Sequence, residues 1–285
     1  MNWTTLVSAE QLAAQLGQSG LRLVDARFVL AAGDADAGEQ AWRHAHLPGA
    51  AYVHLDRDLS DHRKPAGEGR HPLPEAADFC AVLRRLGISP DDQVVVYDAA
   101  DGAMAAARFW WLLRLLGHRR VAVLDGGFAR WTAMGLPTEN CASSVTPGCY
   151  GGEFDHAQIA GADEVMHRLE EAPGWLLDAR AAERFRGDVE PLDPVAGHIP
   201  GAVNRPYSQN IADGRLREPG PLREEFTALL GKHRPDQVLL SCGSGVTACH
   251  NLLAMEHAGL HGARIYAGSW SAWVSDPSRP VATPD

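Results

Sequence analysis

Short apolar runs alternate along this chain with longer stretches in which apolar residues recur at helical spacing. In the first half, four runs predict strands and two stretches predict helices. The predicted strands are Leu21–Asp25, Ala51–His54, Gln93–Tyr97 and Arg120–Leu124, and the predicted helices are Ala76–Leu86 and Ala103–Leu116. Ser8 and Gln11 have the spacing of a capping box, which predicts a helix start near the N-terminus. Alternation of this kind predicts a parallel α/β sheet flanked by helices.

The pattern of the first half returns in the second half. Four pairs of segments match in the same order: Leu23–Arg27 with Leu176–Arg180, His46–Ala50 with His198–Ala202, Val94–Asp98 with Val238–Cys242, and Gly126–Trp131 with Gly268–Trp273. The chain is therefore interpreted as a tandem duplication. A segment rich in Ser, Pro and Gly predicts a linker at 140–152, which leaves one domain at 1–139 and another at 153–285.

The chemically most informative stretch is Val238–Cys249. It reads as an apolar strand, then Cys242, then a loop with Gly243 and Gly245, then a helix beginning near Val246. Backbone N–H groups at such a helix start favour an anion, so we expect the Cys242 thiol to ionise more readily than a free thiol. The glycines let the backbone close around the sulfur. The pattern predicts a nucleophilic cysteine, whereas Cys249 is interpreted as a small core residue.

Composition narrows the class of protein. The chain has 285 residues, 45% hydrophobic and 22% charged, with a net charge of −10 and no basic run, which argues against a nucleic-acid partner. The most apolar stretch, Ala103–Leu116, contains Arg108 and Arg114, so no membrane span is expected, and the N-terminus lacks the features of a signal peptide. Five cysteines without a C-x-x-C pair favour a reducing cytoplasm. The histidines are scattered, so we expect no structural metal.

Asp98 stands in the first copy where Cys242 stands in the second. A carboxylate is a poor nucleophile for sulfur, and Asp98 with Asp101 would repel an anion. The first domain is therefore expected to be inactive and to serve as a scaffold that closes one wall of the site.

The tandem unit, the D-A-R and G-H-I-P-G-A motifs and the C-G-S-G-V-T loop together resemble two-domain sulfurtransferases of the rhodanese family. The resemblance extends from about Val7 to the end of the chain. It implies two rhodanese-like domains and no cofactor. It also implies that Cys242 takes sulfur from a small-molecule donor, holds it as a persulfide and passes it to cyanide, a thiol or a thioredoxin-like acceptor.

The loop of this chain is similar to the loops of 3-mercaptopyruvate sulfurtransferases. Thiosulfate-using members more often carry basic residues, as in C-R-K-G-V-T, where this chain has Gly243 and Ser244. The resemblance therefore favours 3-mercaptopyruvate as the donor, with thiosulfate as the alternative.

The resemblance also assigns roles to individual residues. Arg184 would bind the carboxylate of the donor, because a guanidinium can form two parallel bonds to it. The loop amides, including those of Gly243, Gly245, Val246 and Thr247, would hold the anionic sulfur. Asp56, His71 and Ser244 would move the proton of the donor in a Ser–His–Asp arrangement. Because Asp56 and His71 lie in the first half of the sequence, the site is expected to form where the domains meet.

One position departs from the family pattern. Many mercaptopyruvate members carry a second arginine nine residues after the first, and Asp193 occupies that position here. Arg205 and Arg215 are candidates for the missing guanidinium.

Two other classes of function are considered. Cysteine phosphatases need Cys-x5-Arg, but the sixth residue after Cys242 is Ala248, which argues against that class. A non-catalytic protein that binds a partner or senses persulfide stays open, and the reactivity of Cys242 toward alkylation would distinguish it from an enzyme.

Overall fold

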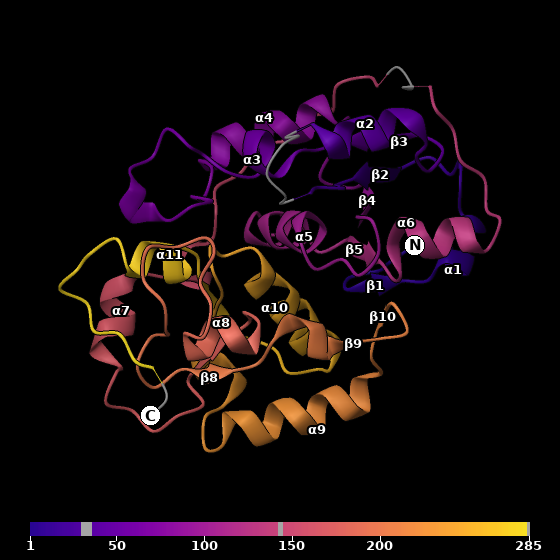
Figure 1. Cartoon of the computed structure of the whole chain (residues 1–285). Helices are drawn as coiled ribbons and strands as arrows, with labels where there is room; N and C mark the ends of the chain where they lie inside the picture. Colours follow the sequence, from indigo (N-terminus) through magenta and orange to yellow (C-terminus); the bar gives the residue numbers. More distant parts are fainter. Residues whose placement is uncertain (30–35, 142–144, 284–285) are drawn as a thin grey trace. The chain divides into compact units, whose positions relative to one another are not determined.

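The computed structural model describes residues 1–29, 36–141 and 145–283. The chain divides into two compact units (Figure 1). Unit 1 comprises Met1–Asp61, Pro74–Asp155 and Asp213–Leu216, and unit 2 comprises His62–Leu73, His156–Ala212 and Arg217–Asp285. His62–Leu73 thus belongs to unit 2 although it lies early in the sequence.

Unit 1 is built on a five-stranded parallel sheet with the strand order β1-β5-β4-β2-β3. Its elements are β1 (Leu6–Val7), α1 (Ala9–Ala13), β2 (Leu21–Asp25), α2 (Ala37–His44), β3 (Ala50–Tyr52), α3 (Leu55–Asp58), α4 (Ala76–Arg85), β4 (Gln93–Tyr97), α5 (Ala105–Leu115), β5 (Val121–Leu124), α6 (Gly127–Ala133) and β10 (Arg215–Leu216). The predicted capping box is confirmed, because the Ser8 hydroxyl accepts the backbone N–H of Gln11 and the Gln11 side chain accepts that of Ser8.

Helices cover both faces of the unit 1 sheet. Alternate strand residues point to opposite faces, and Leu23, Val95 and Tyr97 share a core with Leu12 of α1 and Trp131 of α6. α5 packs against β4 and β5 from the other face. All five residues of β4 are buried, and four of them, Val94–Tyr97, form one apolar run in the sequence.

Unit 2 repeats this architecture with the strand order β6-β12-β11-β7-β8, again all parallel. Its elements are η1 (Ala66–Glu68), η2 (His156–Gln158), β6 (Ile159–Ala160), α7 (Ala162–His167), β7 (Leu176–Asp178), α8 (Ala182–Arg186), β8 (Val203–Asn204), η3 (Tyr207–Asn210), β9 (Ile211–Ala212), α9 (Pro219–Leu230), η4 (Pro235–Gln237), β11 (Leu239–Ser241), α10 (Thr247–His257), β12 (Arg264–Tyr266) and α11 (Ser269–Trp273). The two sheets connect their strands in the same order, so the predicted fold class, a tandem α/β repeat, is confirmed.

The repeated D-A-R motif makes the same buried ion pair in each unit. Nε and Nη2 of Arg27 bind the Asp25 carboxylate at 3.0 and 2.6 Å. Nε and Nη2 of Arg180 bind that of Asp178 at 3.0 and 2.7 Å. Each pair lies at the carboxyl end of a strand, because Asp25 is the last residue of β2 and Asp178 is the last residue of β7. The motif that marks the duplication in the sequence is therefore part of the architecture.

The described part of the predicted linker packs on unit 1. The Tyr150 hydroxyl lies 3.0 Å from Nδ1 of His118, and the Tyr150 carbonyl accepts a hydrogen bond from Arg84 at 2.7 Å. Positions 142–144 of the predicted linker lie outside the described residues. The domain boundaries at 139 and 153 stay a prediction.

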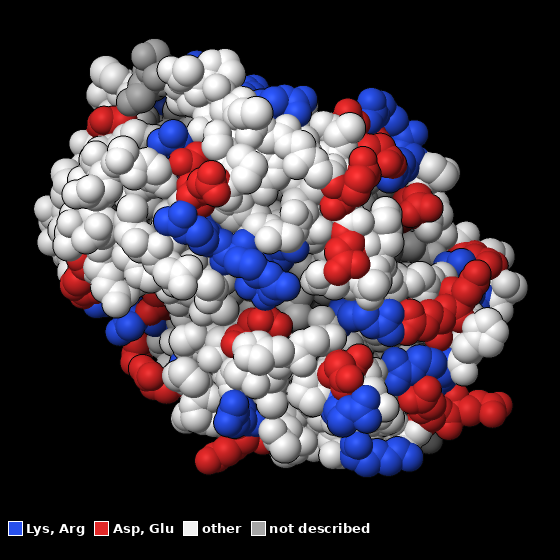
Figure 2. All heavy atoms as spheres, turned by 180° about the vertical axis from the view of Figure 1, so that it is seen from behind, with Lys and Arg blue, Asp and Glu red and all other residues white. Residues whose placement is uncertain are grey.

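On the face shown in Figure 2, acidic and basic side chains lie next to one another in several places, between larger areas without charge. Many acidic and basic side chains of the described residues form pairs, such as Arg217 with Glu225 and Arg264 with Glu164. Of the helices in the described part of the chain, none combines the length and the apolar character needed to cross a membrane.

Candidate functional site

Cys242 follows directly after β11, the central strand of the unit 2 sheet. The chain then turns through a short loop into α10, with Val246 as the residue before the helix and Thr247 as its first residue. Cys242 is 2% exposed. The loop therefore lies at the carboxyl end of a parallel strand, which is where open α/β sheets bind ligands.

Gly245 is required by the backbone of this loop. Its φ of +75° lies in the left-handed region, and a β-carbon at this position would lie 2.2 Å from the carbonyl oxygen of Ala267. No other residue fits this turn without moving the backbone.

The beginning of α11 holds the other side of the loop. The N–H groups of Trp270 and Ser271 donate to the carbonyls of Cys242 and Gly243 at 3.0 and 2.9 Å. The backbone N–H of Cys242 donates to Oγ of Ser269 at 3.1 Å. Sequence reasoning missed Ser269, although the repeat that aligns Gly126–Trp131 with Gly268–Trp273 contains it.

Two predicted relay residues lie together in unit 2. Nδ1 of His71 lies 2.7 Å from Oγ of Ser244, and both side chains are buried. A hydroxyl and an imidazole at this distance share one proton, which either can donate according to the tautomer of the ring. Ser244 is two residues from Cys242, so this pair is next to the thiol in the chain.

Asp56, the third predicted relay residue, belongs to unit 1. It lies in the first turn of α3, where its backbone N–H donates to Nδ1 of His54 at 3.1 Å. Its part in a proton relay stays a prediction.

Arg184 projects from the last turn of α8 and is held by two acidic side chains. Its Nη2 lies 2.6 Å from Oε1 of Glu190 and 3.2 Å from Oδ2 of Asp193, and its Nε donates to Oε2 of Glu190. The side chain of Arg184 keeps 17% of its surface exposed, whereas those of Glu190 and Asp193 keep 4% each. The guanidinium is thus held in place and still reaches solvent.

Arg70 brings a second guanidinium to the same place. It pairs with Oδ1 of Asp193, while its backbone N–H donates to Oγ of Ser271 at 2.9 Å. A β-carbon built on Gly243 would lie 3.1 Å from Nη2 of Arg70 and 3.4 Å from Nη1 of Arg184. Both guanidiniums therefore touch the loop one residue after Cys242.

Sequence reasoning missed Arg70 and proposed two other arginines in its place. The Arg205 guanidinium pairs with Glu225 at 2.9 Å and stacks on Phe226. Arg215 belongs to unit 1, where it pairs with Asp125 at 2.7 Å. No local pattern in the sequence identifies Arg70, because its partner Asp193 lies 123 positions further along the chain.

Burial and charge act against each other on the two acidic groups. Burial raises the pKa of Asp193 above its usual range, although Arg70 and Arg184 act in the opposite direction. For Glu190, burial also acts to raise the pKa, but the hydrogen bond from Arg184 and those from the Leu192 and Asp193 amides leave it lowered.

The equivalent loop of unit 1 holds a carboxylate. Asp98 follows β4 as Cys242 follows β11, and its Oδ1 accepts the backbone N–H groups of Ala100 and Gly102 at 3.1 and 2.9 Å. Burial, and then repulsion from Asp101, raise the pKa of Asp98 to about 6. A loop of this type therefore does surround an anion with backbone N–H groups in this chain.

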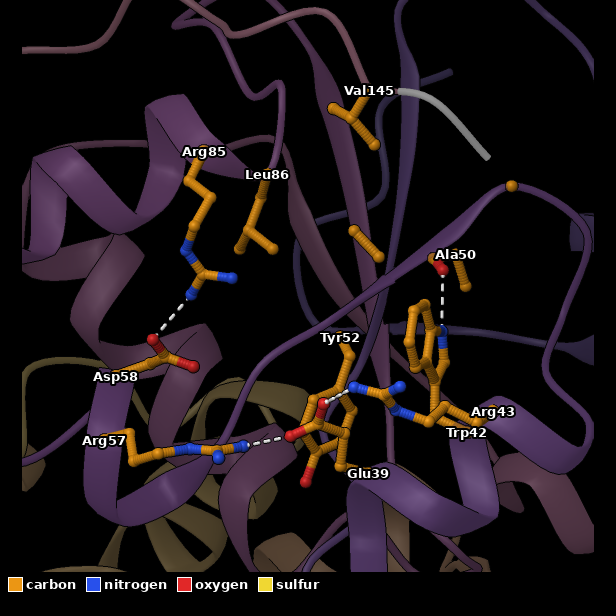
Figure 3. Close-up of a pocket in the computed structure, with 12 residues that line it drawn as sticks. Glu39, Trp42, Arg43, Ala50, Tyr52, Arg57, Asp58, Arg85, Leu86 and Val145 are labelled. Carbon is orange, nitrogen blue, oxygen red and sulfur yellow. Dashed lines mark hydrogen bonds and ion pairs between the residues drawn. The ribbon is translucent and has the colours of Figure 1, made fainter. Parts of the chain in front are cut away.

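A separate cavity of about 480 Å³ lies in unit 1 (Figure 3). Trp42, Tyr52 and Leu86 form part of its wall. Its charged side chains pair with one another: Arg43 and Arg57 with Glu39, and Arg85 with Asp58. The predicted site residues do not line it, so we do not assign the reaction to this cavity.

The two equivalent loops define the class of protein: a duplicated α/β fold with a cysteine site in one copy and a carboxylate in the other. Residues 8–134 and 161–276 both match the rhodanese-like domain family. The chain belongs to the rhodanese family.

Two similar proteins support this assignment over nearly the whole length of the chain. The chain is 47% identical, over all of both chains, to a protein of Pseudomonas aeruginosa named probable 3-mercaptopyruvate sulfurtransferase. It is 41% identical to the putative thiosulfate sulfurtransferase SseB of Mycobacterium tuberculosis, over 97% of this chain and 96% of the relative.

A solved structure agrees in fold as well. The crystal structure of SseA from Escherichia coli, described as a 3-mercaptopyruvate sulfotransferase, has a TM-score of 0.82 and 31% identity, over 94% of this chain and 99% of SseA. The chain is thus a sulfurtransferase.

Proposed function

We propose that this enzyme moves a sulfane sulfur from 3-mercaptopyruvate to a thiol or to cyanide through a persulfide on Cys242. The hydrogen bond between His71 and Ser244, two residues from Cys242, is the observation that carries the choice of donor. Of the two donors considered, 3-mercaptopyruvate has a proton on its transferable sulfur, and thiosulfate has none at neutral pH. A proton-moving pair is therefore useful for the first donor. The names of the relatives from P. aeruginosa and E. coli agree with it.

In the first half of the reaction, the thiolate of Cys242 attacks the sulfur of the donor. The carbon–sulfur bond breaks, and its electron pair passes to the enolate of pyruvate. The thiol proton leaves through Ser244 and His71 and is returned to the enolate, so pyruvate departs and Cys242 carries a persulfide. Asp56 is proposed to orient His71 in this step.

In the second half, the acceptor attacks the outer sulfur of the persulfide, and the electron pair of the sulfur–sulfur bond returns to Cys242. The acceptor is proposed to be cyanide, a small thiol or a thioredoxin-like protein. No cofactor takes part in either half, which gives a double-displacement mechanism with ping-pong kinetics.

Arg184 and Arg70 are proposed to bind the donor carboxylate. Both guanidiniums lie against Gly243, one residue from Cys242, and each can form two parallel bonds to a carboxylate. Arg70 then supplies the guanidinium that the sequence lacks at position 193.

The amides of Gly243, Gly245, Val246 and Thr247 are proposed to hold the anionic sulfur. The loop of unit 1 supports this role, because its amides bind the Asp98 carboxylate in the same way. The same contact supports an inactive first domain at 1–139, in which Asp98 fills the anion site, and a catalytic domain at 153–285.

Thiosulfate is the alternative donor. The name of the M. tuberculosis relative favours it, and two guanidiniums beside the loop would bind a sulfonate-like group as well as a carboxylate. We also propose a cytoplasmic location, which the absence of paired cysteines among the described residues supports.

The deciding experiment compares kcat/KM for 3-mercaptopyruvate and thiosulfate in the wild type and in Cys242→Ser. We expect a clear preference for 3-mercaptopyruvate and no measurable transfer by Cys242→Ser. Cys141→Ser removes an exposed thiol and is the matched control, with unchanged activity. A preference for thiosulfate would remove the proton relay from the proposal. Transfer by Cys242→Ser at the wild-type rate would favour a binding or persulfide-sensing protein instead.

A further inference from the structure

Asp193 lies between the two arginines of the proposed donor site. Its Oδ1 pairs with Nη1 of Arg70 and its Oδ2 lies 3.2 Å from Nη2 of Arg184. The Asp193 side chain is 4% exposed, so water screens this charge poorly. One carboxylate thus occupies hydrogen-bond donors of both guanidiniums that face the loop.

The charges beside the loop balance before a donor arrives. Arg70 and Arg184 bring two positive charges, while Asp193 and Glu190 bring two negative charges, and these four groups are joined by ion pairs. Glu190 also pairs with Arg180, whose charge is matched by Asp178. An incoming anion therefore meets two guanidiniums whose charge is already neutralised. It also approaches the negative charge of Asp193.

We propose that Asp193 is a specificity-determining residue that selects donors of single negative charge over donors of double negative charge. The inference rests on the proposed function, in which Arg70 and Arg184 hold the donor. Coulomb repulsion scales with the product of the charges, so Asp193 opposes the thiosulfate dianion about twice as strongly as the mercaptopyruvate monoanion. An arginine at this position would attract both, and the dianion more. Asp193 thus holds the two guanidiniums in position and weakens their attraction for dianions.

The test is Asp193→Asn, which removes the charge, keeps the size and keeps one of the two oxygens that accept from Arg70 and Arg184. With the full-length enzyme, we expect the KM for thiosulfate to fall about tenfold and that for 3-mercaptopyruvate about threefold, because the smaller charge is repelled less. The kcat for each donor should stay within about twofold, since Asp193 touches the donor-binding arginines and not the sulfur. Asp193→Glu keeps the charge and should keep the wild-type preference.

Asp188→Asn is the matched control. It makes the same change of charge five positions away, where Asp188 is 53% exposed and pairs with Arg186. Water screens that charge, so both KM values should stay as in the wild type. If Asp193→Asn does not fold, Asp193→Ser replaces it, with the same expected shift between donors.

The failure of this inference can be told from the failure of the proposed function. If Arg70→Ala and Arg184→Ala each raise the KM of a donor, but Asp193→Asn changes the two donors equally or no more than Asp188→Asn, only the role of Asp193 is wrong. If neither arginine variant changes the KM of either donor, the donor site itself is wrong, and the inference fails with it.

Discussion

The hydroxyl oxygen of Ser269 accepts the backbone N–H of Cys242 at 3.1 Å, while the same hydroxyl donates to the carbonyl of Tyr266 at 2.9 Å. Ser269 has a φ of +52°, in the left-handed region that serine seldom adopts. Gly127, the matching residue of unit 1, has a φ of +53°. Unit 2 therefore has a serine in a backbone conformation for which unit 1 uses a glycine. The hydroxyl of this serine holds the backbone of Cys242 in place.

This strain gives a pair of variants that separate conformation from hydrogen bonding. Ser269→Gly and Ser269→Ala both leave the buried Cys242 N–H without its acceptor, and we expect kcat/KM to fall about tenfold in each. Only glycine relieves the strain, so Ser269→Gly should be more stable than Ser269→Ala by about 1 kcal/mol. Urea unfolding and steady-state kinetics measure both effects. Ser275→Ala, in an exposed serine of the next turn, is the control, and wild-type kcat/KM in both Ser269 variants would contradict the role.

Removing the relay pair, Ser244 and His71, should lower kcat/KM for 3-mercaptopyruvate much more than kcat/KM for thiosulfate. Ser244→Ala and His71→Gln should each lower kcat/KM for 3-mercaptopyruvate about a hundredfold, because that donor must lose a thiol proton. Thiosulfate has no such proton, so its kcat/KM should change less than about threefold. The double variant should be little worse than either single one, since the two residues act as a unit. Equal losses for both donors would show that the pair only supports the loop; His261→Gln, at an exposed histidine, is the control.

Asp98 should make stability depend on pH in a way that its amide variant does not. Burial raises the pKa of Asp98 to about 6 in the folded chain, above its ordinary value of 3.8. The folded state therefore holds this proton more tightly than the unfolded state, and the stability from this group is full below pH 3.8 and is lost as the pH rises through 6. Asp98→Asn keeps the oxygen that accepts from Ala100 and Gly102 and has no charge to bury.

Relative to wild type, Asp98→Asn should thus gain stability between pH 4 and pH 7, by about 3 kcal/mol at most. Urea unfolding at a series of pH values measures the gain. Sulfur transfer should be unaffected, because unit 1 has no nucleophile in this loop. A gain that does not change with pH would mean that the Asp98 carboxyl titrates alike in the folded and unfolded chains.

The strands of unit 1 show how much of the fold could be predicted from the sequence. β2 and β4 have the predicted bounds, Leu21–Asp25 and Gln93–Tyr97, because most of their residues are buried and apolar, with Val94–Tyr97 forming one apolar run in β4. β3 is Ala50–Tyr52 rather than the predicted Ala51–His54. There the extended chain continues to His54, which instead caps α3 by accepting the N–H groups of Asp56 and Arg57. Local polarity does not reveal where pairing ends and a cap begins.

The site was harder to predict than the fold. Cys242 could be found because the strand, the glycines and the helix that surround it are neighbours in the sequence. Arg70 could not, because its partner Asp193 is 123 positions away and only the folded chain joins them. The same holds for Ser269, whose hydroxyl acts on Cys242 from 27 positions further on.

The two glycines that flank Ser244 should respond differently to alanine. Gly245 has a left-handed φ, and a β-carbon added to it would lie 2.2 Å from the Ala267 carbonyl oxygen. Gly245→Ala must therefore move rigid backbone and should cost more than about 3 kcal/mol of unfolding free energy. A β-carbon added to Gly243 would lie 3.1 and 3.4 Å from the ends of the Arg70 and Arg184 side chains, which can turn aside. Gly243→Ala should therefore keep nearly the full stability but raise the donor KM several-fold, because it displaces Arg70 and Arg184 from the loop. Urea unfolding and steady-state kinetics on both variants test this contrast, and a donor KM in Gly243→Ala equal to that of the wild type would show that the guanidiniums do not hold the donor from where they lie.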